Sequence, residues 1–294
     1  MDKKRVLILG ATGMLGSAVY DVLKDKYDLA LTARNRDKIG LLENAYGGTQ
    51  NHDVYEFDAR GVYNDFLNKK GHPGEYLSNF VGEVGDVDFV INGIGITIPF
   101  SMEDPAMTFF INGALPHILA NNFGGRLIHI TTDCVYNGKE GFPYDERSLK
   151  TPVDIYGKSK SLGEPEHSLT IRTSIIGPEL ESHTGLLDWF INQPSEEVNG
   201  FAGHYWNGIT TKQFGKICDE IMSNRKNYPE SGVYHVFSTS VSKYEMLNKF
   251  KDKYGLSVKI NEEKENKLNR TLSTVKELND LLNIPSFDEM IDEL

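Results

Sequence analysis

The sequence predicts an α/β fold, in which short strands and helices alternate along the chain. The first apolar run, Val6 to Leu9, leads through the glycine-rich segment GATGMLG into a helical pattern that continues to Leu23. Further short apolar runs follow at intervals that leave room for helices between most of them. Because a crossover helix packs back on the sheet it leaves, this alternation favours parallel strands. We expect a Rossmann-type doubly wound parallel sheet with a smaller C-terminal α/β substrate-binding portion.

The elements of the large sheet are expected within residues 1–175. Six segments have the apolar composition of strands: 6–9, 28–32, 54–57, 87–91, 126–130 and 169–172. Two helices bear directly on function. One follows the glycine segment and has Leu15 and Val19 on its apolar side, and the other begins near Ile155. We expect this portion to bind the cofactor and to carry the catalytic residues.

The alternation loosens beyond residue 175. Residues 177–208 are rich in glycine, proline and aromatic residues, which predicts loops and one short helix at 185–191. Helices at 211–222 and 243–254, with a strand at 233–237, complete a smaller portion. We expect residues 176–294 to bind the substrate, with a soft boundary that leaves room for the chain to interleave between the two portions.

Composition and charge narrow the classes of partner. A formal net charge of -11 argues against a general binder of nucleic acid or of anionic membranes, because such proteins present a dominant basic face. The two cysteines, Cys134 and Cys218, lie far apart and form no metal-ligand pattern, which fits a reducing compartment. Met1 to Arg5 lead directly into a strand that is too short for a signal peptide or a membrane span. We expect a cytoplasmic protein without a metal site.

The glycine segment between the first strand and helix predicts a dinucleotide site. Gly10 permits a tight turn, Gly13 lets the backbone approach a pyrophosphate, and Gly16 permits close helix packing. The positive end of the helix dipole then favours the phosphate charge. The alternative is a glycine-rich turn without a ligand, and the position directly after the N-terminal strand disfavours it. The expected cofactor contacts here are Gly10, Thr12, Gly13, Met14, Leu15 and Gly16.

The end of the second strand indicates which dinucleotide is preferred. An acidic residue there would bind the adenosine ribose and favour NAD, but this chain has Arg34 in the segment LTARNRDK. Arg34, with Arg36 and Lys38 as candidate helpers, is suited to hold a 2′-phosphate. We therefore expect NADP(H) as the preferred cofactor, with NAD(H) as the alternative. A solvated basic loop without a ligand is the plainer interpretation.

A tyrosine and a lysine in the segment YGKSK form the candidate catalytic pair. Tyr156 and Lys160 are four residues apart, so they share one face of a helix. A neighbouring ammonium is expected to lower the pKa of the phenol by stabilising the phenolate. Thr132, twenty-four residues earlier in ITTDCVY, is positioned to donate a hydrogen bond to a substrate oxygen. A pair on an exposed helix face is the alternative, and it is disfavoured because the glycine segment and Thr132 both stand where the chemistry needs them.

Several longer motifs together resemble one known family. They are GATGMLG, INGIGIT, INGALPHILA, IHITTDCVYNG, FPYDE, YGKSKSLGE and IRTSIIG, and they cover most of the chain. The chain resembles the extended short-chain dehydrogenase/reductase superfamily, and within it the dTDP-4-dehydrorhamnose reductases and related nucleotide-sugar reductases. The resemblance implies a catalytic triad of Thr132, Tyr156 and Lys160. It also implies adenine contacts at Asp58 and Ala59, and contacts on the nicotinamide side at Asn92, Gly93, Ile94 and Gly95.

Departures from the family pattern bear on the reaction. Ile175 stands where rhamnose reductases commonly have tryptophan, and the later Arg-Pro pattern is Arg270-Thr271. Cys134 replaces the glutamate that removes a proton in related dehydratases, which argues against dehydration. Asp133 stands where simple epimerases usually have a small residue. We expect reduction of a 4-keto nucleotide sugar by NADPH, in deoxysugar or surface polysaccharide biosynthesis.

Two other functions stay open at this point. One is a nucleotide-sugar epimerase or epimerase-reductase on the same scaffold. The other is a non-catalytic NADP-binding regulatory subunit, because the regulatory subunit of methionine adenosyltransferase resembles this reductase family. A homodimer is compatible with the sequence, although no segment specifies an oligomeric state.

The substrate end of the site rests on three candidate residues. A nucleotide-sugar pyrophosphate requires positive charge, which Arg270 supplies, with Lys267 or Lys212 as candidate helpers. Trp206, beside Tyr205, is a candidate to stack on a base or sugar, with ordinary packing beneath a loop as the alternative. Asp133 completes the set because it directly follows Thr132.

Overall fold

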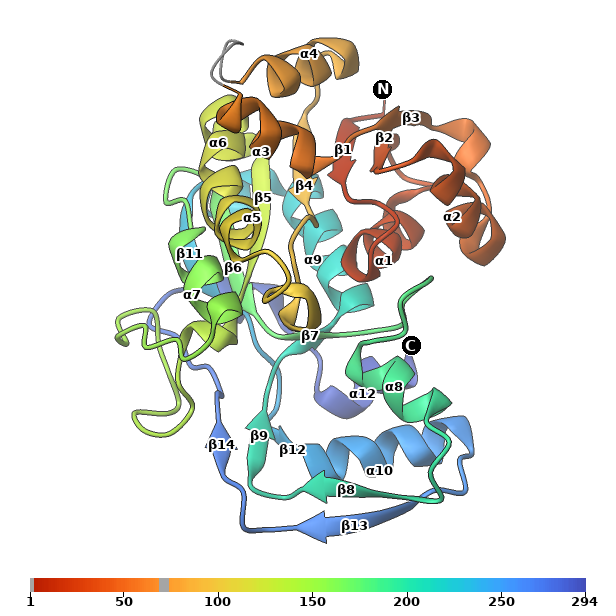
Figure 1. Ribbon diagram of the computed structural model, residues 1–294, viewed down its shortest axis with the longest axis vertical. Coiled ribbons are helices and arrows are strands. Elements are labelled where there is room, and N and C mark those ends of the chain that lie inside the picture. Colours follow the sequence, from red (N-terminus) through yellow and green to blue (C-terminus); the bar gives the residue numbers. More distant parts are fainter. Residues whose placement is uncertain (1–2, 69–73) are drawn as a thin grey trace.

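The computed structural model describes residues 3–68 and 74–294. Residues 1, 2 and 69–73, which fall inside the first predicted portion, lie outside the described residues. The large sheet contains β1 (Arg5–Leu9), β2 (Asp28–Ala33), β3 (Asp53–Glu56), β4 (Phe89–Asn92), β5 (Leu127–Thr132), β6 (Leu169–Thr173) and β11 (Gly232–His235). These strands are all parallel, in the order β11-β6-β5-β4-β1-β2-β3 (Figure 1). The predicted doubly wound sheet is confirmed.

Helices cover both faces of this sheet because its central strands are apolar on both sides. Val6 and Ile8 point into one hydrophobic core, whereas Leu7 and Leu9 point into the other. This explains why the strands read as continuous apolar runs rather than as alternating ones. The first core is completed by α1 (Met14–Leu23), α2 (Ile39–Tyr46), α9 (Thr211–Ser223) and α11 (Leu278–Leu282), and the second by α3 (Ala59–Leu67), α4 (Glu75–Val84), α5 (Pro105–Phe109) and α6 (Leu115–Phe123).

The order of the strands creates one natural binding position. From β1 the chain proceeds to β2 and β3 on one side, and then to β4, β5, β6 and β11 on the other. The two directions diverge between β1 and β4, which is the position at which sheets of this type have a ligand-binding crevice at the carboxyl ends of their strands. The glycine segment follows β1, and Gly93 to Gly95 follow β4. The fold therefore brings both predicted cofactor loops to this crevice.

Residues beyond 175 build a second region and also return to the large sheet. Strand β11 pairs with β6, and α9 packs against α1 so closely that a Cβ on Gly215 would lie 3.0 Å from Val22 Cγ2. The chain thus interleaves between the two regions. Every helix in the described part of the chain is too short or too polar to cross a bilayer.

The smaller region contains strands that the sequence pattern did not predict. Within 177–208, expected to hold loops and one helix, lie α8 (Leu186–Asn192), β8 (Glu197–Phe201) and β9 (His204–Trp206). Strand β8 pairs with β13 (Lys259–Glu263), and β9 pairs with β12 (Val241–Ser242) and β14 (Leu268–Asn269). Figure 1 shows these strands below the large sheet, beside α10 (Lys243–Tyr254) and α12 (Phe287–Asp292). Two short strands, β7 (Ile175–Ile176) and β10 (Ile209–Thr210), join the regions.

Candidate active site

The glycine turn between β1 and α1 is constrained by close backbone approach. Gly10 has φ of +76°, a conformation that favours glycine, and its N–H donates to Thr32 Oγ1 at 2.9 Å. A Cβ on Gly16 would lie 2.1 Å from the carbonyl oxygen of Gly10, so the start of α1 reaches this turn only with glycine at position 16. Among the described residues no side chain caps α1. Its first backbone N–H groups therefore favour an anionic ligand.

The loop after β4 lies directly against the glycine turn. A Cβ on Gly93 would lie 3.1 Å from the carbonyl oxygen of Leu9, and a Cβ on Gly10 would lie 3.2 Å from Ile94 Cγ1. Asn92 is buried and holds this loop, because its Oδ1 accepts from the Ile94 N–H at 3.1 Å. The Asn92 side chain is thus committed to the protein, and Gly93 to Gly95 form the part of this loop that borders the crevice.

Helix α7 (Ile155–Leu162) carries the predicted tyrosine and lysine. Its N-cap is Asp154, whose carboxylate accepts from the Gly157 N–H at 2.7 Å. A Cβ on Gly157 would lie only 2.3 Å from the carbonyl oxygen of Cys134, so α7 packs directly on the turn that follows β5. This packing brings Tyr156 next to the hydroxyl of Thr132, which favours the ionised form of the phenol.

Lys160 extends from the same helix toward the loop after β4. It is buried, and its Nζ would lie 2.9 Å from a Cβ on Gly95. Asn112 connects these elements, because its side chain bonds the backbone of Ile96 in both directions at 2.8 Å and donates to Ser159 Oγ at 3.1 Å. The structure therefore brings the predicted lysine to the loop that borders the glycine turn.

The pKa shifts of the pair differ from the expectation in one respect. Burial, followed by the charge of Cys134, raises the pKa of Tyr156 above its ordinary value, and Thr132 opposes this shift. Burial lowers the pKa of Lys160 to about 8. The phenol is consequently protonated at neutral pH, which is the state that a proton donor requires.

The turn after β5 gathers charged groups from distant parts of the chain. Asp133 is buried, accepts from Thr132 Oγ1 at 3.2 Å, and has a pKa that burial raises. Arg270 reaches this turn from the segment after β14, where its Nε donates to the Tyr136 carbonyl oxygen at 3.0 Å. Lys243, at the start of α10, also acts electrostatically on Asp133. Sequence reasoning missed Lys243, because a lone lysine at a helix start carries no motif.

The other substrate candidates are placed differently. Trp206 is only 4% exposed and packs edge-on against Phe287 at 5.9 Å, so its ring lies inside the core of the smaller region. The adjacent Tyr205 is 46% exposed. Lys212 donates to the Glu293 carbonyl oxygen at 2.9 Å, and the exposed Lys267 lies beside Gly203. Neither lysine accompanies Arg270 at the turn after β5.

The residues expected at the adenosine end lie at the carboxyl ends of β2 and β3. Arg34 is exposed and acts electrostatically on Asp58. Asp58 caps α3 and pairs with Arg60, while Ala59 is buried. Lys38 forms an ion pair with Glu181 from the loop before α8. Arg34 and Arg36 are both exposed and form no ion pair within the described part of the chain, so both are open to a ligand.

A family model identifies the chain's relatives. The model described as the RmlD substrate binding domain matches residues 4–274. The chain belongs to this RmlD family. The fold and the family predicted from the motifs are thereby confirmed.

The relatives of this RmlD-family chain carry different names, and they align with different shares of the chain. The spore coat polysaccharide biosynthesis protein SpsK of Bacillus subtilis strain 168 is 29% identical over 59% of the chain and 63% of SpsK. A dTDP-4-dehydrorhamnose reductase of Burkholderia thailandensis is 37% identical over 32% of each protein. Methionine adenosyltransferase 2 subunit beta of Danio rerio is 26% identical over 86% of the chain and 75% of that subunit. The chain thus matches less than two thirds of the length of the first two relatives.

Solved structures share the fold of the RmlD-family chain along almost its whole length. A dTDP-4-dehydrorhamnose reductase from Bacillus anthracis, in complex with NADP, superposes with a TM-score of 0.70 at 19% identity and covers 99% of this chain and 98% of that one. WbmG of Bordetella bronchiseptica, in complex with NAD, gives a TM-score of 0.70 at 16% identity and covers 99% and 92%. Of these two structural neighbours, the first therefore binds NADP and the second NAD.

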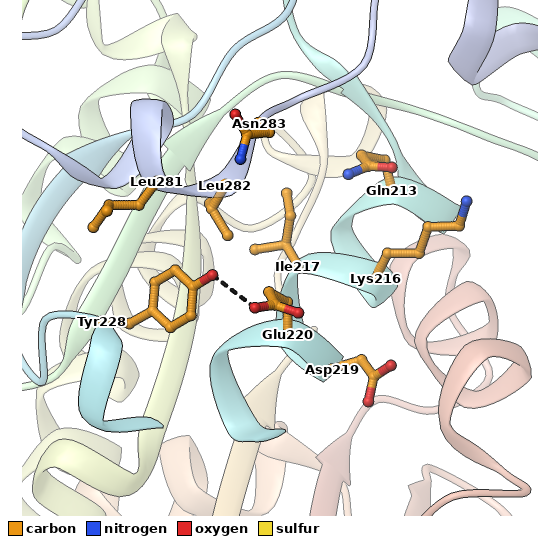
Figure 2. A pocket seen from close by; sticks show the side chains of 9 residues that line it. All are labelled: Gln213, Lys216, Ile217, Asp219, Glu220, Tyr228, Leu281, Leu282 and Asn283. Carbon is orange, nitrogen blue, oxygen red and sulfur yellow. Dashed lines mark hydrogen bonds between the residues drawn. The ribbon is translucent and has the colours of Figure 1, made fainter. Parts of the chain in front are cut away.

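Two cavities of this RmlD-family protein lie away from the crevice. One, of about 490 Å³, opens beside α9, where the Tyr228 hydroxyl donates to Glu220 Oε1 at 2.9 Å (Figure 2). The other, of about 950 Å³, lies between the end of α8 and the strands β8 and β13. Neither is lined by a predicted site residue. Among the described residues, no group of three or more His, Cys, Asp or Glu side chains is arranged to hold a metal ion.

Proposed function

We propose that this chain is an NADPH-dependent reductase of a 4-keto nucleotide sugar, of the dTDP-4-dehydrorhamnose reductase type, in deoxysugar or surface polysaccharide biosynthesis. One observation carries the proposal: Tyr156 lies beside Thr132, while Lys160, on the same helix, lies beside Gly95 in the loop that touches the glycine turn. A proton donor and a dinucleotide cradle at one crevice suit the reduction of a carbonyl group.

The cradle fits a dinucleotide because its glycines leave the backbone open where a side chain would intrude. The residues we assign to the cofactor are Gly10, Thr12, Gly13, Met14, Leu15, Gly16, Arg34, Asp58, Ala59, Asn92, Gly93, Ile94 and Gly95. Leu15 packs its side chain into the hydrophobic core, so only its backbone N–H is offered to phosphate. Arg34 supports a preference for NADP(H), since its exposed guanidinium suits a 2′-phosphate.

The chemistry that bound NADPH supplies is hydride transfer to the keto carbon. In our proposal Tyr156 donates its phenolic proton to the developing alkoxide. The Thr132 hydroxyl turns from Asp133, to which it donates in the free protein, and donates a hydrogen bond to the same oxygen. Lys160 holds the nicotinamide ribose, and its positive charge stabilises the phenolate after the proton has left. The raised pKa of Tyr156 supports this direction, because the phenol begins the reaction protonated.

We assign substrate binding to Asp133, in the turn after β5, and to Arg270, which reaches this turn. In our proposal residues 176–294 supply most of the remaining substrate contacts. The expected stacking of Trp206 on a base or sugar is not part of this proposal, because its ring is packed in the core. The exposed Tyr205 is the aromatic side chain of that segment available to a ligand.

The test is a spectrophotometric assay of NADPH consumption with dTDP-, UDP-, GDP- and CDP-linked 4-keto sugars. We expect one nucleotide series to be reduced with one NADPH consumed for each sugar. Conversion of a sugar without net NADPH consumption would instead identify the epimerase. No turnover of any sugar, together with tight NADPH binding, would contradict the reductase.

A second candidate function has a specific observation in its favour. Methionine adenosyltransferase 2 subunit beta, whose name describes a subunit rather than a whole enzyme, matches 86% of this chain. On that basis the chain would be a non-catalytic NADP-binding regulatory subunit. The combination of Thr132, Tyr156 and Lys160 at one crevice favours catalysis, because a binding module has no use for a proton donor there. Co-purification with an adenosyltransferase, in the absence of turnover, would favour the regulatory role.

A further inference from the structure

Lys243 is the first residue of α10, and its ammonium interacts electrostatically with Asp133 in the turn after β5. The helix is fixed there by a capping box, in which Ser242 and Glu245 exchange hydrogen bonds. The Lys243 ammonium lies 5.7 Å from the centroid of the Trp206 ring and 3.7 Å from Met246 Sδ. Trp206 and Met246 are both buried, so one side of the ammonium faces apolar surface. On its other side Lys243 acts electrostatically on Asp133 and Cys134.

The charges around Asp133 do not balance. Lys243 and Arg270 both act on this buried carboxyl, yet among the described residues neither has a carboxylate oxygen within 4.0 Å. Two cations therefore share a single acidic group and hold no direct ion pair. Placing an ammonium against apolar surface without such a pair costs stability, which an anionic ligand would offset.

We propose that Lys243, together with Arg270, binds an oxyanion of the substrate beside Asp133. The inference rests on the proposed function, because it assumes that the substrate reacts at Tyr156, next to this turn. The ligand chemistry is a phosphate or carboxylate oxygen. It has two sources in a nucleotide sugar: the diphosphate linker, or an acidic substituent on the sugar ring.

The experiment measures binding by isothermal titration calorimetry to the whole protein, with NADPH present. Three probes separate the sources: UDP, UDP-glucose and UDP-glucuronate, each repeated with its thymidine, guanosine and cytidine counterparts. Lys243→Met keeps the apolar stem against Trp206 but removes the charge. We expect the Kd of the Lys243→Met variant for the affected probes to rise on the order of 10- to 100-fold. An equal rise for all three probes assigns the diphosphate, and a rise confined to the uronate assigns the sugar carboxylate.

Two variants serve as controls. Lys251→Met removes a lysine charge from the same helix, eight residues and about 12 Å further along, and should leave every Kd unchanged. Lys243→Arg keeps the charge and should restore binding. The proposal is wrong if Lys243→Met binds all probes as the wild type does. It is equally wrong if Lys251→Met weakens binding as much, or if the wild type binds NADPH but none of the probes.

Dependence on pH supplies an independent readout. Burial lowers the pKa of Lys243 to about 8, so anion binding should weaken as the pH rises from 7 to 9. The Lys243→Arg variant should not weaken, because guanidinium stays charged. The groups that face Lys243 are Asp133, Cys134, Arg270 and His204. They are the same in both proteins, so the difference between the two profiles reports residue 243. Identical profiles would contradict the assignment.

NADPH affinity and turnover distinguish failure of this inference from failure of the proposed function. If Lys243→Met keeps normal substrate affinity and normal reduction, the reductase stands and the anion site is wrong. If the wild type reduces no sugar but binds the probes through Lys243, the anion site stands and the reductase is wrong.

Discussion

At the scale of single residues, the proposed mechanism depends on a phenol that begins the reaction protonated. Burial raises the pKa of Tyr156, and the adjacent Thr132 only partly opposes that shift. Burial acts on Lys160 in the opposite direction and lowers its pKa to about 8. Both shifts follow from one cause, because a low-dielectric site disfavours whichever form is charged. The pair is therefore prepared to donate a proton at neutral pH.

Removing the Tyr156 hydroxyl should abolish most of the activity. We expect Tyr156→Phe to lower kcat by a factor on the order of 10² to 10⁴, because proton donation to the alkoxide is lost while the ring still packs. NADPH binding should be unchanged, as measured by fluorescence titration. Tyr254, at the end of α10 and exposed, provides the matched control, since Tyr254→Phe should keep normal turnover. Full activity of Tyr156→Phe would disprove the mechanism.

Replacing Arg34 should change the preference between cofactors. We expect Arg34→Ala to weaken NADPH binding on the order of 10-fold or more, because a charge-assisted hydrogen bond to the 2′-phosphate is lost. NADH lacks that phosphate, so its Kd measured in the same titration should not change. An unchanged NADPH to NADH ratio would show that Arg34 is only a solvated surface cation.

At the scale of elements, the position of α7 depends on glycine rather than on side-chain attraction. Gly157 lets the helix touch the turn after β5, and Gly163 lets its end approach the carbonyl oxygen of Asn112, where a Cβ would lie 1.9 Å away. That end is also held by His129, whose Nε2 donates to the Gly163 carbonyl oxygen at 3.0 Å. Burial keeps the pKa of His129 well below its ordinary value, so the ring stays neutral in this role.

Adding one methyl group at position 157 should displace α7. A Cβ there would lie 2.3 Å from the Cys134 carbonyl oxygen, so we expect Gly157→Ala to lower the free energy of unfolding by about 1–3 kcal/mol and to reduce turnover. Urea denaturation measures the first effect. Gly82, in α4, is the matched control because a Cβ there meets nothing within 4 Å, so Gly82→Ala should be neutral or stabilising by up to about 1 kcal/mol. Equal stabilities of the two variants would refute this packing argument.

At the scale of the whole molecule, one buried polar network connects the segment after α7 with β6 and β11, the last two strands at one edge of the large sheet. Arg172 in β6 pairs with Glu164 at 2.6 Å and donates to His235 Nε2 in β11 at 2.7 Å. His235 Nδ1 in turn donates to the Ser273 carbonyl oxygen at 2.7 Å, and Tyr136 joins from the turn after β5. The network thus links the segment after α7 to residues more than a hundred positions later in the chain.

Acid should weaken this network through His235. Burial, followed by the charge of Arg172, lowers the pKa of His235 to about 4, whereas the unfolded chain binds this proton near its ordinary value of 6.5. Between these values the unfolded state binds more protons, so stability should fall as the pH decreases from about 6.5 to 4. His235→Gln keeps one donor and one acceptor and should flatten this dependence in thermal unfolding. The exposed His167→Gln should not, and a matching effect there would argue against His235.

Local patterns in the sequence were enough to predict the doubly wound sheet, the glycine turn and the helix that carries Tyr156 and Lys160. These features depend on side-chain periodicity, on the conformational freedom of glycine and on the four-residue spacing of a helix face, all of which act over a few residues. The strands β8, β9, β13 and β14 escaped prediction because they pair with partners about sixty residues away. Their own residues alternate poorly.

Which distant residues meet depends on the tertiary packing. Arg270 reaches Cys134 across 136 positions, Lys243 acquires its place beside Asp133 from the packing of α10, and Trp206 is enclosed by Phe287 rather than left open. None of these contacts leaves a periodic trace in the sequence, because each depends on how whole elements pack after the chain has closed long loops. Local sequence patterns were thus sufficient for the scaffold and the candidate chemistry, whereas long-range packing brings Arg270 and Lys243 to the turn after β5.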